Sequence, residues 1–67
     1  MKSFKERLKE LREKKRLLQN QIADDLKVPR STYSNWEQGR SEPDIAMIKK
    51  ICIFFKCGYE DLLGAIE

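Results

Sequence analysis

Residues 30–38 carry several side chains that form hydrogen bonds at short range. If this segment is a helix turning by about 100° per residue, Tyr33, Trp36 and Glu37 share one side. The opposite side carries short hydroxyls and amides, which belong to Ser31, Ser34, Asn35 and Gln38. This outer side has no Lys, Asp or Glu, although 37% of the chain is charged. Such a face can approach another surface closely and exchange hydrogen bonds with it.

The base edges of the DNA major groove are one surface that this face fits. An amide side chain pairs with an adenine edge, as Asn35 would here. Arg30 stands at the leading end of the predicted helix, where its fork could bind guanine in a bidentate manner. An ordinary polar helix surface has a similar composition, so the segment by itself leaves both interpretations open.

Catalysis has no comparable set of residues. The chain contains no histidine, and it has no glycine-rich phosphate loop. Cys52 and Cys57 lie in an apolar context, which predicts free thiols without a disulfide or a metal site. The acid pairs at 24–25 and 60–61 are adjacent in sequence and are expected on exposed helix faces. We therefore expect neither an enzyme nor a bound cofactor.

Length and charge are those of a small helical domain. The chain has 67 residues, so residues 1–67 are expected to form a single domain. The longest apolar run, residues 51–55, is too short to span a bilayer, and the N-terminal segment lacks the apolar stretch of a signal peptide. Fourteen basic residues against eleven acids give a net charge of +3, which is compatible with a polyanionic partner. These features predict a cytoplasmic protein without a membrane segment.

Apolar periodicity and turn residues predict an all-α fold. The expected helices cover about residues 3–15, 19–26, 30–38, 45–55 and 59–66. Ser3 with Glu6, and also Asp44, are expected to cap helices, whereas Gly39 and Gly58 are expected to interrupt them. The fourth helix has a predicted inward stripe, which consists of Ile45, Ile48, Ile51, Cys52 and Phe55.

The stretch LREKKRLLQNQIADDLKVPRSTYSNWEQGRSEP resembles the Cro and phage-repressor type (lambda-repressor-like) helix-turn-helix family. Its most specific segments are LLQNQIA and STYSNWEQG, and the resemblance extends from Phe4 to Leu63. It implies a compact five-helix domain in which the second and third helices form the helix-turn-helix. It also implies a sequence-specific regulator of transcription that binds a double-stranded DNA operator. The competing interpretation is a protein-interaction module or antitoxin on the same fold, with weak or no DNA binding.

The resemblance also implies roles for individual residues. The base-reading positions are Arg30, Ser31, Ser34 and Asn35. Contacts with DNA phosphates are expected from Gln19, Asn20, Gln38 and Arg40. Arg12 and Glu37 match a structural salt bridge that links the first helix to the end of the third in related repressors.

Several positions depart from the family's pattern. Leu18 stands where the family prefers a Ser or Thr cap, which leaves that role to Gln19 or to a phosphate. Lys27 and Arg16 replace glycines, so Lys27 is expected to adopt a left-handed conformation at a cost of about 1 kcal/mol. Pro29 presets the backbone at the start of the third helix.

Apolar residues near the C-terminal end predict a homodimer. Ile53 is expected nearly opposite the inward stripe, with Phe54 beside it. With Leu63 and Ile66 they would form a two-fold interface, which would place two recognition helices about 34 Å apart on a palindromic operator. Scattered exposed apolar side chains are the competing explanation.

Overall fold

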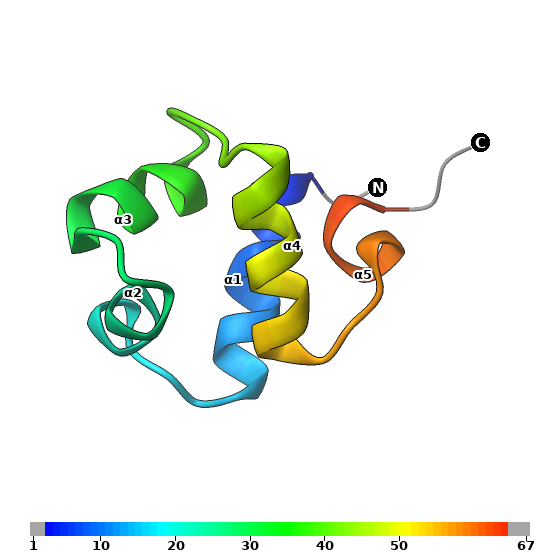
Figure 1. The fold of residues 1–67 in the computed structure, drawn as a ribbon, viewed down its shortest axis with the longest axis horizontal. Coiled ribbons are helices and arrows are strands. Elements are labelled where there is room, and N and C mark those ends of the chain that lie inside the picture. The colour runs from blue at the N-terminus through cyan, green and yellow to red at the C-terminus, as the bar shows by residue number, and fades with distance from the viewer. Residues whose placement is uncertain (1–2, 65–67) are drawn as a thin grey trace.

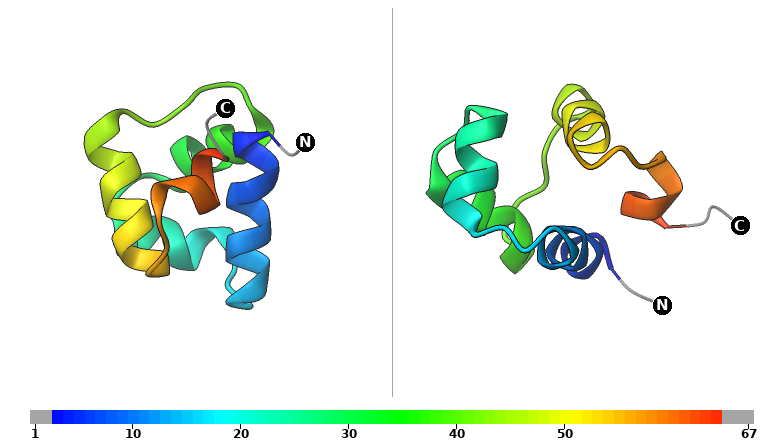
Figure 2. Two further views of the ribbon diagram at one scale, coloured as in Figure 1. Left: turned by 90° about the vertical axis from the view of Figure 1, so that its right-hand side faces the viewer. Right: turned by 90° about the horizontal axis from the view of Figure 1, so that it is seen from below.

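The computed structural model describes residues 3–64, and within this range the chain forms helices but no strands (Figure 1). The helices are α1 (Phe4–Lys14), α2 (Gln19–Leu26), α3 (Arg30–Gln38), α4 (Ile45–Phe55) and α5 (Tyr59–Leu63). The all-α prediction is therefore confirmed. The helix-turn-helix pair α2 and α3 lies on one side of α1 and α4, and α5 lies on the other side (Figures 1 and 2). Ile66, which was expected in the last helix, lies outside the described residues.

At α1 and α2, the side chain of the third helical residue accepts a hydrogen bond from the backbone amide of the residue just before the helix. The Glu6 carboxylate accepts hydrogen bonds from the amide of Ser3 at 3.2 Å and from its hydroxyl at 2.9 Å. At α2, the amide of Leu18 donates to Oε1 of Gln21 at 2.7 Å. Of the two caps expected for α2, Gln19 or a phosphate, Gln19 does not take the role, because its amide donates to Glu37. Gln21 stands at the third helical position, from which a side chain reaches back to the capping residue.

Left-handed residues directly end α2, α3 and α4, and another left-handed residue, Arg16, follows α1. Lys27 has φ 60° and ψ 44° as predicted, and Arg16, which also replaces a glycine, has φ 56°. Gly39 ends α3 at φ 76°. Gly58 interrupts the helical pattern between α4 and α5 as expected, with an ordinary φ of −83° just before α5. The left-handed residue that ends α4 is Lys56, with φ 54°.

We predict that Lys27→Gly raises the free energy of unfolding by about 0.5–1 kcal/mol. Glycine removes the contact between Cβ and the backbone that makes the left-handed region costly, and this gain exceeds its added entropy in the unfolded chain. Urea unfolding followed by circular dichroism measures the change. Lys9→Gly, at an exposed position inside α1, is the matched control and should lose about 0.5–1 kcal/mol. Equal losses in the two variants would contradict the strain at Lys27.

The core draws residues from all five helices. Its buried members are Leu8, Ile22, Ala23, Leu26, Tyr33, Trp36, Ile51, Cys52, Phe55 and Leu62. Asp44 caps α4 as expected, because its Oδ1 accepts from the amide of Met47 at 2.8 Å. The inward stripe of α4 is correct except at Ile45, whose surface is 82% exposed. Ile45 lies about 9 Å along the helix axis from Ile51, so the periodicity continues past the end of the core.

Candidate nucleic-acid interface

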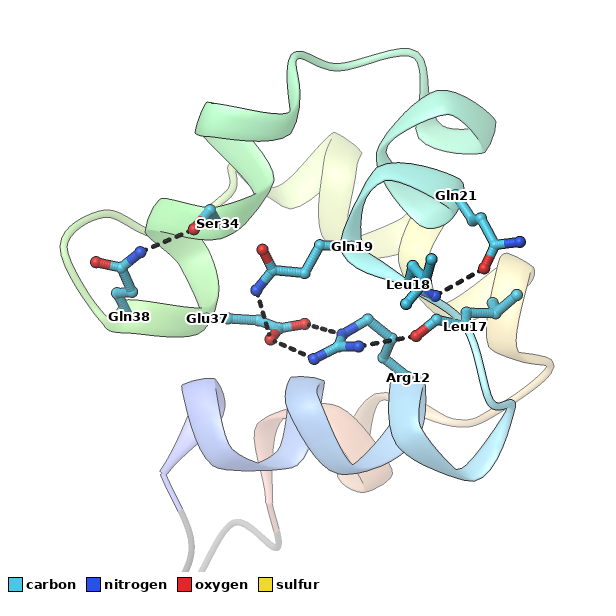
Figure 3. A network of polar contacts seen from close by, with 8 residues as sticks. All are labelled: Arg12, Leu17, Leu18, Gln19, Gln21, Ser34, Glu37 and Gln38. Carbon is cyan, nitrogen blue, oxygen red and sulfur yellow. Dashed lines mark hydrogen bonds and ion pairs between the residues drawn. The ribbon is translucent and has the colours of Figure 1, made fainter.

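A polar network joins α1, α2 and α3 at the base of the helix-turn-helix (Figure 3). Nε of Arg12 donates to Oε2 of Glu37 at 2.6 Å, and Nη2 donates to Oε1 at 3.1 Å. Nη1 of Arg12 donates to the carbonyl oxygen of Leu17 at 2.8 Å. Nε2 of Gln19 completes the network by donating to Oε1 of Glu37 at 3.1 Å. The expected salt bridge is therefore present, and the three interactions together hold the end of α3 against α1 and the start of α2.

Burial makes this network sensitive to the loss of one partner. The side chains of Arg12 and Glu37 are 13% and 4% exposed. Burial alone would raise the pKa of the Glu37 carboxyl, but the hydrogen bonds from Arg12 and Gln19 hold it below its ordinary value. The hydrogen bond with Glu37 raises the pKa of the Arg12 guanidinium. Both groups are thus ionised in the folded protein at neutral pH, as an ion pair requires.

Tyr33 adds a buried hydroxyl beside this network. Burial raises the pKa of its phenol well above the ordinary value, and the nearby Glu37 carboxylate adds to the shift. The hydroxyl makes no hydrogen bond of good geometry within residues 3–64. The ring packs edge-on against Trp36, with centroids 5.9 Å apart. The inner side of α3 therefore serves the core and the ion pair.

The outer side of α3 carries the predicted base-reading residues. Arg30 and Ser31 are exposed at the start of the helix, and Ser34 and Asn35 are half-buried one turn later. Nε2 of Gln38 donates to Oγ of Ser34 at 2.8 Å, a contact between positions one helical turn apart that was not foreseen. The i, i+4 spacing was its only signal in the sequence.

The predicted phosphate-binding residues are distributed around this face. Asn20 is exposed in the first turn of α2, and Gln38 and Arg40 are exposed at the end of α3. Gln19 is half-buried and already donates to Glu37, so part of its side chain serves the network. The first turn of α2 also presents backbone amides that lack partners inside the helix, which is the usual arrangement for binding an anion.

Cys52 and Cys57 lie where α4 turns into α5. Both are free thiols, and burial raises the pKa of Cys57 to about 11. Burial also raises the pKa of Cys52. Both thiols are therefore protonated at neutral pH, and a protonated thiol is a weak nucleophile.

A helix-turn-helix family model matches residues 8–62, which include α2, α3 and both partners of the buried ion pair. The chain belongs to this helix-turn-helix family, of Cro and phage-repressor type. The family assignment agrees with the geometry, since two short helices are joined by a turn at Lys27 and held against α1 by Arg12.

Two relatives of this helix-turn-helix protein are named as regulators of transcription. The HTH-type transcriptional activator BcrR of Enterococcus faecalis is 39% identical over 64 residues. This match covers 96% of the chain but 31% of BcrR. A crystal structure of a transcriptional regulator from Listeria innocua is similar with a TM-score of 0.89 at 28% identity, covering 97% of the chain and 61% of that protein. The chain thus spans less than two thirds of either relative. Within residues 3–64, no helix is long and apolar enough to cross a membrane.

Proposed function

We propose that the protein is a regulator of transcription that binds double-stranded DNA with α3 in the major groove. The observation that carries this proposal is the outer side of α3, where Ser31, Ser34 and Asn35 lie away from the side that buries Tyr33 and Trp36, with Arg30 exposed at the leading end of the helix. Short hydroxyls and amides suit base edges, whereas the acidic residues that would repel phosphates are absent from these positions. This function places the protein with the DNA in the cytoplasm.

The proposed binding geometry separates base-reading residues from phosphate contacts. Phosphate contacts are assigned to Asn20, Gln38, Arg40 and the part of the Gln19 amide that does not contact Glu37. These groups surround the reading face, which is the outer side of α3 with its base-reading residues. Contacts with phosphates position a protein on the duplex, whereas contacts with base edges determine which sequence is preferred. The network of Arg12, Glu37 and Gln19 holds the reading helix in place for both.

We predict that Arg30→Ala and Asn35→Ala change the preferred base at separate positions of the binding site, at a cost of about 1–3 kcal/mol each. Selection of bound sequences from a random DNA pool, followed by affinity measurements on the enriched site, tests this result. Arg40→Ala is the matched control, because loss of a phosphate contact should weaken all sequences alike and reduce the salt dependence. An unchanged preference in both reading variants would contradict the assignment of this face.

The same measurements separate DNA binding from the competing function, a protein-interaction module or antitoxin. Binding to phosphates releases counterions, so the affinity for DNA should fall steeply as salt concentration rises. A wild-type chain without DNA affinity at low salt would favour the protein-interaction function instead.

We further propose that the regulator binds a palindromic operator as a homodimer. Ile53 is 68% exposed and Leu63 is 48% exposed, so both are available to a second copy. Phe54 is half-buried and packs edge-on against Phe55 at 5.1 Å, so it supports the core as well as the proposed interface. A groove beside Ile53 and Phe54 extends to Lys27 and the end of α2.

We predict that the wild-type protein is a dimer at micromolar concentration and that Ile53→Lys converts it to a monomer. A charged side chain in the centre of an apolar interface is desolvated without a partner, which opposes association. Sedimentation equilibrium measures the result. Ile45→Lys, at an 82% exposed position on the first turn of the same helix, is the control and should leave association unchanged. A dimer that survives Ile53→Lys would exclude this interface.

A further inference from the structure

Two side chains on the outer side of α3 form a pair before any DNA is bound. Nε2 of Gln38 donates to Oγ of Ser34 at 2.8 Å (Figure 3). Ser34 is half-buried and lies in the middle of the helix, whereas Gln38 is exposed in its last turn. The carbonyl oxygen of the Gln38 amide points away from Ser34 (Figure 3). The hydrogen bond thus fixes where the Gln38 carbonyl oxygen and the Ser34 hydroxyl lie relative to each other.

The direction of this hydrogen bond determines what Ser34 offers to a ligand. A hydroxyl has one proton and two acceptor sites, and the Gln38 amide occupies one of the acceptor sites. Within the described part of the chain, the Ser34 hydroxyl makes no other hydrogen bond, so its proton remains available. A hydroxyl whose oxygen accepts one hydrogen bond is polarised, so its O–H becomes a stronger donor.

We propose that Gln38 is a positioning residue that makes Ser34 a hydrogen-bond donor in base recognition. The inference rests on the proposed function, and it moves the main role of Gln38 from phosphate binding to sequence preference. A donating hydroxyl fits the acceptors that guanine, adenine and thymine present in the major groove. Cytosine presents its amino donor at that edge, and with one of its two acceptor sites occupied by Gln38 the Ser34 hydroxyl should favour the other three bases over cytosine at the position that it reads.

The two possible roles of Gln38 differ in a measurable way. A phosphate contact contributes equally to every sequence, so its loss weakens all sites alike and lowers the salt slope. A positioning residue acts through Ser34, so its loss alters the preference at the same base position that Ser34→Ala alters. The coupling between the two substitutions therefore distinguishes the roles.

The experiment selects binding sites from a random DNA pool with the wild type, Ser34→Ala, Gln38→Ala and the double variant. Affinities are then measured for the enriched site and for the same site with cytosine at the altered position. We expect each single variant to lower the preference against cytosine by about fivefold at one shared position, with the double variant no worse than either. Asn35→Ala is the control and should combine additively with Gln38→Ala at a different position.

Gln38→Glu tests the direction of the hydrogen bond. A carboxylate only accepts, so it would bind the Ser34 proton and leave the hydroxyl to accept from the base. The preference at this position should then shift toward cytosine, even though the added negative charge weakens binding to all sequences.

Four outcomes would each overturn a claim. If Gln38→Ala weakens all sequences alike, or if it alters a position other than that of Ser34→Ala, the inference fails while the proposed function stands. If Gln38→Glu leaves the preference at the shared position unchanged, the assigned direction of the hydrogen bond is wrong. If the wild type enriches no sequence and binds no DNA at low salt, the proposed function itself fails.

Discussion

Glu37→Ala is expected to lower the free energy of unfolding by about 3–5 kcal/mol, because it leaves the Arg12 guanidinium, whose side chain is only 13% exposed, without its charged partner. It also removes the acceptor of the Gln19 amide. A small domain has a total stability of only about 5–15 kcal/mol, so this loss would remove a large share of it. Urea unfolding followed by circular dichroism measures the change. A loss below about 1 kcal/mol would show that the ion pair does not hold α3 to α1.

The pH dependence of the same pair gives an independent control. The pKa of Glu37 is lowered by folding from an ordinary value of 4.5, so its ionised form stabilises the fold above that pH. This contribution is lost as the pH falls through the lower pKa of the folded state. Glu37→Gln cannot titrate, so the difference in stability between wild type and Glu37→Gln should shrink below about pH 4.5. A difference that stays constant down to pH 2 would contradict the shift.

The second large effect is expected at the aromatic pair on the inner side of α3. Trp36 is 5% exposed and packs edge-on against Tyr33. Trp36→Ala should therefore cost about 3–5 kcal/mol, through lost burial and the cavity that it leaves. DNA affinity should fall with it, because the outer side of α3 is presented only when the inner side is packed. Urea unfolding and a DNA titration of the same sample test both effects.

Leu18→Ala is the matched control for this substitution. Leu18 is a large apolar residue that is 64% exposed, so its truncation should change stability by no more than about 0.5 kcal/mol. If Trp36→Ala and Leu18→Ala had equal effects, the assignment of Trp36 to the core would be wrong. Trp36→Ala could also lose stability but keep full DNA affinity at a temperature where it is folded. That result would contradict the claim that DNA binding by the outer side of α3 requires the packing of its inner side.

The nine residues of α3 perform three tasks on different sides of one helix. Tyr33 and Trp36 bury the inner side, and Glu37 connects the helix to α1 and α2. Ser34 and Asn35 remain on the outer side for the proposed contacts with bases. Because the period of a helix is about 3.6 residues, neighbours in sequence can serve the core and the ligand without interfering.

Much of the fold was predictable because helices depend on local chemistry. Apolar spacing and caps predicted α1 to α4 within about one residue at each end, and Asp44 caps α4 as expected. The left-handed conformation of Lys27 was predicted because Lys27 replaces the glycine expected in the turn of the resembled family. The pairing of Arg12 with Glu37 also followed from the resemblance to related repressors rather than from the spacing of the two residues.

Only the tertiary structure decided which apolar residues are covered and which polar groups are already engaged. Ile45 continues the apolar stripe of α4 but extends past the core, and Lys56, which no sequence signal singled out, ends that helix in a left-handed conformation. Gln19 meets a carboxylate 18 residues away, which its own neighbours in sequence do not indicate. Helical periodicity is a property of neighbouring residues, whereas burial and hydrogen-bond partners depend on where distant segments meet in the folded chain.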